Sequence, residues 1–219
     1  DWPEYKKRLQ PDPGRLPANL QQQIDDAETS ESPVAVMGAS LMGWARNWMG
    51  VENFAYFMYD EPDVFSDMVD TLSNLTCWTI DQVVPRMKRK PDMVLGWEDI
   101  CGRSGPFVSP GLFKKHVAPG YIKVRNKIEE YGIKLLGIDS DGDVSALAGP
   151  LLDAGVNLSY PLEIGAWNAD PMEFRKRYGR ELRIIGGFNK MVIEKGPVEI
   201  DAEIERRLPI MKDGGYLLL

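Results

Sequence analysis

The sequence predicts an α/β fold in which parallel strands form a β/α barrel. Short apolar runs of strand length alternate with helical stretches, and the turns between them lack hairpin signals. Carboxylates directly follow several of these runs, at strand ends that meet at one mouth in a barrel. A flavodoxin-like open sheet is the alternative, because it also alternates strands with helices.

The N-terminal residues 1–32 are expected to form an irregular arm, because Pro, Gln, Asp and Glu dominate there and apolar positions are scattered. One short helix is expected around residues 20–27. The barrel domain then covers residues 33–219 and begins with a strand at 34–37. A flexible loop from Gly38 follows and carries Trp44, Arg46, Asn47 and Trp48. A helical block then starts at Val51, with Pro62 in the first turn of its main helix.

The middle of the barrel domain contains a strand at 93–97 and a helix that starts at Ser109 and Pro110. Serine accepts a hydrogen bond at a helix N-terminus, and proline is pre-set for the first helical turn. This helix is expected to kink near Pro119 and to end at Gly132.

The C-terminal half repeats a strand and a helix. Asp143 and Asp170 are expected to cap two of the helices, and a last helix is expected near 201–212. Glycines such as Gly155 and Gly179 stand between a helix and the next strand, where they supply a left-handed conformation. The strands are expected at 133–138, 156–160, 183–185 and 216–219.

Composition and charge exclude several classes of partner. The chain has 219 residues, 43% of them hydrophobic, and a net charge of −7 without a basic stripe, so no nucleic-acid partner is expected. No stretch reaches the roughly 18 apolar residues that span a membrane. Two cysteines are too few for a disulfide framework, and we expect a cytoplasmic protein. The chain starts without Met and stops in a strand-like run, so we expect a portion of a longer protein, with the barrel incomplete at both ends.

Polar side chains at the strand ends form the candidate site. Several like charges close together imply a shared proton with a raised pKa, a bound cation or a cationic substrate. Trp97 lies beside the acids and would shape the pocket. The polar residues are Glu98 and Asp99 after the strand at 93–97, Asp139 and Asp141 after 133–138, Glu163 after 156–160 and Asn189 after 183–185.

Each candidate also has an ordinary structural interpretation. The alternative for Asp139 and Asp141 is to hydrogen-bond their own backbone in a turn, although the site interpretation is favoured for both. Glu163 is equally suited to be a solvated loop acid. Asp99 would then cap its own loop. Asp143 fits a helix cap better than a site acid.

The remaining reactive residue types give little support to other chemistry. His116 is expected on a solvated helix face, and a single histidine excludes sites that need two. Cys101 is a candidate soft metal ligand, although an inert thiol is the more frequent case. Nucleotide-binding glycine loops, serine-hydrolase elbows and zincin motifs are all missing from the sequence.

A set of short motifs resembles the uroporphyrinogen decarboxylase superfamily. In chain order they are LMG at 41–43, MGVEN at 49–53, EP at 61–62, GWED at 96–99, SP at 109–110, DSDGD at 139–143, AGV at 154–156, PLE at 161–163, YG at 178–179, GGFNK at 186–190 and GGY at 214–216. The resemblance implies a (β/α)8 TIM barrel, of which this chain is an incomplete part. It also implies one of two activities: decarboxylation of a porphyrinogen without a cofactor, or methyl transfer from a corrinoid to a zinc-activated thiol.

The sequence departs from both activities. Where the methyltransferases carry His-x-Cys-Gly, this chain has Asp139, Ser140, Asp141 and Gly142, so a thiolate site becomes a carboxylate site that favours a different metal or weaker zinc binding. The arginine-rich N-terminal motif of the decarboxylases is not visible. The ending at Glu163 is closer to the methyltransferase-like branch.

The expected function is therefore that of an enzyme near the corrinoid-dependent methyltransferases. Asp139, Asp141 and Glu163 would bind a divalent metal or a cationic group of the substrate. Glu98 and Asp99 would act as general acid and base, or would hold these residues in place from behind the site. Trp97 and Asn189 would line the pocket. The partners implied are a small-molecule substrate and a corrinoid or corrinoid protein, with no nucleic acid and no membrane.

Three alternatives stay open. A true uroporphyrinogen decarboxylase of heme biosynthesis would need no cofactor, but an acidic mouth suits a polycarboxylate substrate poorly. A glycosidase would use paired carboxylates such as Glu98 and Glu163. A non-catalytic barrel would only bind a small molecule.

Overall fold

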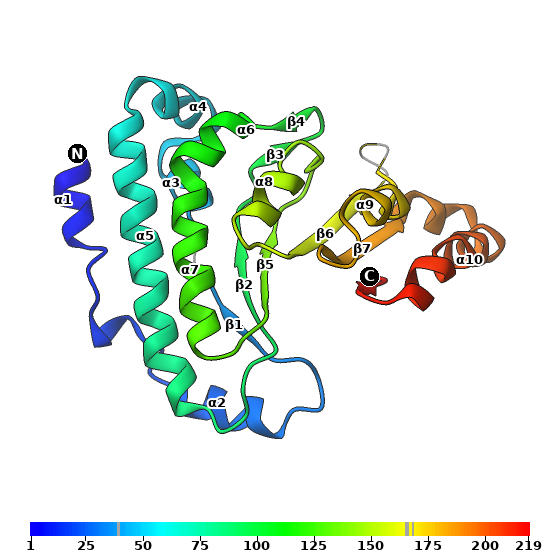
Figure 1. Ribbon diagram of the computed structural model, residues 1–219, viewed down its shortest axis with the longest axis horizontal. Coiled ribbons are helices and arrows are strands. Elements are labelled where there is room, and N and C mark those ends of the chain that lie inside the picture. The colour runs from blue at the N-terminus through cyan, green and yellow to red at the C-terminus, as the bar shows by residue number, and fades with distance from the viewer. Residues whose placement is uncertain (39, 165–166, 168) are drawn as a thin grey trace.

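The computed structural model describes residues 1–38, 40–164, 167 and 169–219 (Figure 1). Within these residues, the main sheet has six parallel strands, each hydrogen-bonded to the next. The six strands expected from the sequence are all present. In sheet order they are β1 (Ala35–Met37), β2 (Met93–Trp97), β5 (Leu135–Asp139), β6 (Leu158–Ile164), β7 (Arg183–Asn189) and β8 (Tyr216–Leu217).

The strand order follows the chain without a reversal. Right-handed crossovers that always step in the same direction put the connecting helices on one side of a sheet, as in a barrel. A doubly wound sheet instead reverses its strand order where its helices change sides. The barrel prediction is therefore confirmed as an incomplete β/α barrel, and the flavodoxin-like alternative is wrong.

The helices lie outside the strands. In Figure 1, α5 and α7 run side by side along one side of β1, β2 and β5, while α9 and α10 lie beside β6 and β7. The α-helices are α1 (Trp2–Lys7), α2 (Leu20–Thr29), α3 (Gly43–Met49), α4 (Val51–Asp60), α5 (Pro62–Val83), α6 (Pro110–Leu112), α7 (Ala118–Glu130), α8 (Ala148–Asp153), α9 (Pro171–Tyr178) and α10 (Pro197–Asp213). Short 3₁₀ segments are η1 (Pro13–Arg15), η2 (Val84–Arg86) and η4 (Lys190–Lys195), and a π-helical segment is η3 (Phe113–Val117). Among the described residues, no helix is long and apolar enough to cross a bilayer.

The capping chemistry mostly follows the sequence. The Ser109 hydroxyl accepts a hydrogen bond from the Leu112 N–H at 3.2 Å, and Asp170 accepts one from the Met172 N–H at 3.0 Å. The kink expected near Pro119 takes the form of the π-helical segment η3, which comes directly before α7.

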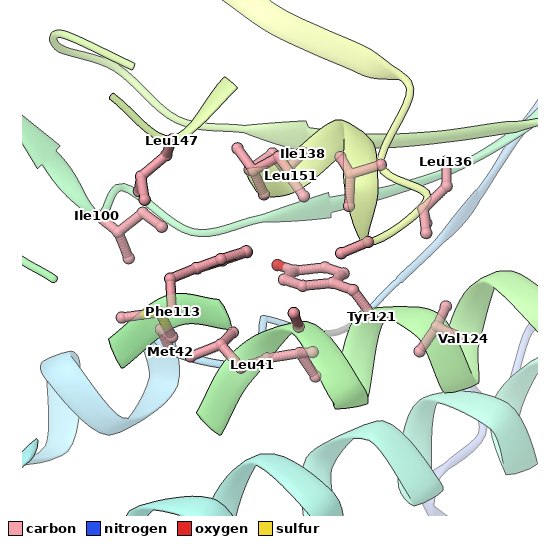
Figure 2. Packing of buried hydrophobic residues seen from close by; sticks show 14 of the residues in the cluster. Leu41, Met42, Ile100, Phe113, Tyr121, Val124, Leu136, Ile138, Leu147 and Leu151 are labelled. Atoms are coloured by element: carbon pink, nitrogen blue, oxygen red, sulfur yellow. The ribbon is translucent and has the colours of Figure 1, made fainter. Parts of the chain in front are cut away.

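The core lies between the sheet and helices α5 and α7. Figure 2 shows Leu136 and Ile138 of β5 above Tyr121 and Val124 of α7, and all four side chains are buried. Gly120 lets α7 approach α5 closely, because a Cβ at this position would lie 2.7 Å from Val69. Apolar burial in this layer is the main term that stabilises the fold.

Two local predictions were wrong. His116 is not solvated: it is 7% exposed, and its Nδ1 lies 2.7 Å from the Ser66 hydroxyl. Asp143 does not cap a helix, because α8 starts only at Ala148. Its carboxylate accepts a hydrogen bond from the Ser145 N–H at 2.9 Å in a turn.

Three elements were not expected from the sequence. Helix α3 (Gly43–Met49) lies where a flexible loop was expected. Helix α1 lies in the arm and is tied to α5 by Trp2 and Lys6, which both bond the carboxylate of Asp67. A small antiparallel hairpin joins β3 (Cys101–Gly102) to β4 (Gly105–Pro106). These contacts depend on partners distant in the chain or on a two-residue turn, neither of which gives a periodic sequence signal.

Candidate functional site

The carboxyl ends of the strands form one mouth, and the pairing register decides which side chains face it. Trp97, Asp139 and Tyr160 are register partners on β2, β5 and β6, so their side chains share one face of the sheet. Glu98 and Ser140, one residue further along, point to the opposite face, toward the helices, and are buried. The strand period of two therefore separates Glu98 from the other acids.

Glu98 holds the turn between β1 and α3. Its Oε1 accepts hydrogen bonds from the Leu41 N–H at 2.7 Å and from the Tyr121 hydroxyl. Its Oε2 accepts bonds from the N–H groups of Met42 and Gly43, both at 2.8 Å, and from the Ser40 hydroxyl at 2.9 Å. Burial raises the pKa of Glu98, and these donors oppose that effect. With 0% of its surface exposed, Glu98 is enclosed by this turn.

Asp99 lies on the mouth and is paired with Arg46, a residue that the sequence did not single out as a site residue. Arg46 Nη1 donates to the Asp99 carbonyl at 2.7 Å, and its Nη2 lies 3.8 Å from Asp99 Oδ2. The Arg46 guanidinium also stands 6.0 Å from the centre of the Trp97 ring, a cation–π distance. Trp44 packs edge-on against the same ring at 5.2 Å. The sequence feature that could have pointed to Arg46 as a site residue is its position in the segment that follows the first strand.

Asp139 and Asp141 lie in the middle of the mouth. Burial raises the pKa of Asp139, and the negative charges of Asp99 and Asp141 raise it further. Asp141 is exposed, and its pKa is raised by partial desolvation and by the negative charges of Glu163 and Asp99, while Lys190 lowers it. Among the residues that the structure describes, no donor or cation contacts either carboxylate directly. These two groups therefore carry the unbalanced negative charge of the mouth.

Glu163 is held by two partners. Its Oε1 accepts a bond from Lys190 Nζ at 2.8 Å, and its Oε2 accepts one from the Gly142 N–H at 2.9 Å. The hydrogen bond from Lys190 lowers the pKa of Glu163, so this carboxylate stays ionised. Gly142 has a φ of +84°, and a Cβ there would lie 2.7 Å from the Cys101 carbonyl oxygen, so only glycine fits.

Asn189 is the N-cap of η4 and does not lie among the acids of the mouth. Its side chain accepts a hydrogen bond from the Met191 N–H at 3.1 Å, at the start of η4. Its own N–H donates to the buried carboxylate of Glu203 at 3.2 Å. Glu203 in turn pairs with the buried guanidinium of Arg207, whose Nη2 lies 2.6 Å away. This network joins β7 to α10.

The structure thus brings four of the predicted acids together and separates two other polar candidates. Along the mouth the charges run from Arg46 through Asp99, the Asp139 and Asp141 pair, and Glu163 to Lys190. Glu98 and Asn189 make structural contacts outside this row. Lys190 was missed as a site residue because its role depends on a partner 27 residues away.

The donor set does not fit the metal expected from the resemblance. In the described part of the chain, no three or more His, Cys, Asp or Glu side chains are grouped as a metal ion requires, Asp139, Asp141 and Glu163 included. Cys101 is buried, and burial raises the pKa of its thiol to about 12, which disfavours the thiolate that binds metals. The structure therefore gives no support to a metal centre.

Comparisons with known proteins bear on the fold. No model of a known protein family matches the sequence, and no curated protein matches it either. Among solved structures, the fold is similar to that of a methyltransferase from Methanosarcina mazei, with a TM-score of 0.67 and 16% sequence identity. The match covers 93% of this chain but only 60% of the methyltransferase chain. This chain therefore spans about three fifths of the length of that methyltransferase.

Proposed function

We propose that this chain belongs to an enzyme of the uroporphyrinogen decarboxylase-like superfamily, on the branch near the corrinoid-dependent methyltransferases. Asp139 and Asp141 are the reacting carboxylates. One observation carries the proposal: both lie at the barrel mouth with raised pKa values and without a direct protein partner among the described residues. Groups whose charge is left unbalanced in this way are typical of catalytic sites. The fold similarity to a methyltransferase supports the choice of branch.

The chemistry follows from replacing a thiolate site by carboxylates. A corrinoid bound at the mouth would supply the methyl group, and a thiol substrate would receive it. The thiol proton must leave as sulfur attacks, and an ionised Asp139 or Asp141 accepts it as a general base. A raised pKa makes either carboxylate a better base than an ordinary aspartate. The Trp97 ring forms an apolar side of the pocket beside the two aspartates. Arg46, which is paired with Asp99, contacts this ring and holds its orientation.

The other candidate activities receive less support. Decarboxylation of a polycarboxylate would need free cations at the mouth, whereas Arg46 and Lys190 already contact Asp99 and Glu163. A glycosidase that used Glu98 and Glu163 would need both carboxyl groups to reach a sugar. Glu98 is fully buried beneath the β1–α3 turn.

The proposal is tested by incubating the purified chain with methylcobalamin and a small thiol and following loss of the methyl–cobalt absorbance. We expect protein-dependent demethylation that falls about 10²-fold in Asp139→Asn or Asp141→Asn, the usual effect of losing a general base. The matched control is Asp153→Asn, an acid at the end of α8 with a 73% exposed side chain, which should keep the full rate. Absence of methyl transfer together with decarboxylation of a porphyrinogen would overturn the proposal and favour the decarboxylase alternative.

A further inference from the structure

We infer that Lys190 is a positioning residue for the mouth: by holding Glu163, it fixes the loop that presents Asp141. The inference deepens the proposed function, because it takes Asp141 as a reacting group. Lys190 is the first residue of η4, directly after β7, and Glu163 stands near the end of β6. Strands β5, β6 and β7 are neighbours in the sheet, so three successive strand ends are linked through these side chains.

The linkage consists of two short contacts in series. Lys190 Nζ lies 2.8 Å from Glu163 Oε1, and the Gly142 N–H donates to Glu163 Oε2 at 2.9 Å. Each bond uses a different carboxylate oxygen of Glu163. Lys190 therefore fixes the carboxylate through Oε1, and the carboxylate fixes the backbone of the loop through Oε2. Hydrogen bonds to an ionised carboxylate are about twice as strong as neutral ones.

The loop has little freedom to find another position. Gly142 is buried, and a Cβ added there would lie 2.7 Å from the Cys101 carbonyl oxygen and 2.8 Å from that of Gly102. On its other side, the Asp141 N–H makes only a long contact of 3.4 Å with Asp99 Oδ1. Backbone hydrogen bonds hold the loop at its two ends: the Ser140 N–H donates to the Tyr160 carbonyl at 2.8 Å, and the Asp143 N–H donates to the Gly102 carbonyl at 2.9 Å. Between them, the bond from the Gly142 N–H to Glu163 is the short contact with a side chain, directly beside Asp141.

Lys190 serves this role without being a main source of stability. Its side chain is 60% exposed, whereas that of Glu163 is 15% exposed. An exposed ion pair contributes little to the free energy of unfolding, because water screens it. Loss of Lys190 should therefore loosen the loop locally while leaving the melting temperature almost unchanged.

The test is hydrogen exchange of the Gly142 amide, measured residue by residue by NMR on the full chain without substrate. Lys190→Gln should speed exchange at Gly142 about threefold, the effect of removing an exposed ion pair, and Lys190→Arg should restore the original rate. Glu163→Gln should speed it by about tenfold, because the charged acceptor itself is lost. The matched control is Lys195→Gln, an exposed lysine at the other end of η4 that makes no contact with the mouth among the described residues.

Two outcomes would overturn the inference. One is an unchanged exchange rate at Gly142 in Lys190→Gln, equal to that in Lys195→Gln. The other is faster exchange across the whole sheet with a lower melting temperature, which would make Lys190 a general stabilising residue. Combining Lys190→Gln with Glu163→Gln should add nothing to the effect of Glu163→Gln alone, since Lys190 acts through Glu163. The measurement needs no methyl donor, so it stands apart from any failure of the proposed activity.

Discussion

Replacing Glu98 by glutamine tests the role of the buried carboxylate most sharply. The side chain keeps its size but exchanges one acceptor oxygen for an NH₂ group. Five donors converge on Glu98: three backbone N–H groups and the hydroxyls of Ser40 and Tyr121. We expect Glu98→Gln to destabilise the fold rather than to change a catalytic rate.

The magnitude follows from counting the donors that lose their acceptor. If the NH₂ group replaces Oε1, only the Leu41 N–H is left without a partner, because the Tyr121 hydroxyl can turn and accept instead. If it replaces Oε2, the N–H groups of both Met42 and Gly43 are left, so the first arrangement is preferred. An unsatisfied buried donor costs about 1 to 3 kcal/mol, and the remaining bonds lose their charge assistance. Relief from burying a charge offsets part of this loss, so we expect a net loss of about 3 kcal/mol.

The assay is urea unfolding followed by circular dichroism at neutral pH. The midpoint should fall while the slope stays constant, which indicates lower stability without a change in the surface exposed on unfolding. Tyr121→Phe is the matched control: it removes one donor and leaves Leu41 paired, so a smaller loss of about 1 kcal/mol is expected. If Glu98→Gln were as stable as the original protein, the carboxylate would not be the ionised acceptor of five bonds, and the reasoning would fail.

Three further changes have defined outcomes in the same unfolding assay. Asp141 has a pKa above its ordinary 3.8, so its ionised form costs stability at higher pH; Asp141→Asn should be stabilising at neutral pH, and the gain should vanish as the pH falls toward 3.8. Arg207→Met leaves the 1% exposed Glu203 without its main partner and should cost about 3 to 5 kcal/mol; an intact stability would show that the pair is not buried in solution. Gly142→Ala forces a side chain into a φ of +84° and toward the Cys101 carbonyl, so a loss of about 1 to 3 kcal/mol is expected, and an unchanged midpoint would contradict the crowding.

Local features of the sequence predicted most of the fold. The helix starts at Ser109 and Asp170 follow from cap chemistry, which involves residues two or three apart. The strands follow from apolar runs bounded by glycine, and their order in the sheet follows from right-handed crossovers. Their exact ends did not follow: β6 and β7 continue to Ile164 and Asn189, several residues past the expected ends.

The part of the site that the sequence predicted is the set of acids that follow the strands. Asp99, Asp139, Asp141 and Glu163 converge as expected, because parallel strands bring their carboxyl ends together. Glu98 was placed with them because sequence position alone does not show which face of the sheet a residue at the strand end points to.

The cationic partners of these acids could not be predicted from the sequence. Arg46 and Lys190 meet their carboxylates across 53 and 27 residues, and neither pairing leaves a periodic pattern. His116 was misjudged for the same reason: its partner, Ser66, lies on another helix, 50 residues away. Long-range pairs of this kind appear only once the helices are packed on the sheet.

The most direct test of the central claim is an NMR titration of the side-chain carboxyl carbons of Asp139, Asp141 and Glu163. We expect pKa values above 3.8 for both Asp139 and Asp141, because desolvation and mutual repulsion act on them, and a value below 4.5 for Glu163, because Lys190 donates a hydrogen bond to it. Ordinary or lowered values for Asp139 and Asp141 would contradict the claim that these two carboxylates hold the unbalanced charge of the mouth.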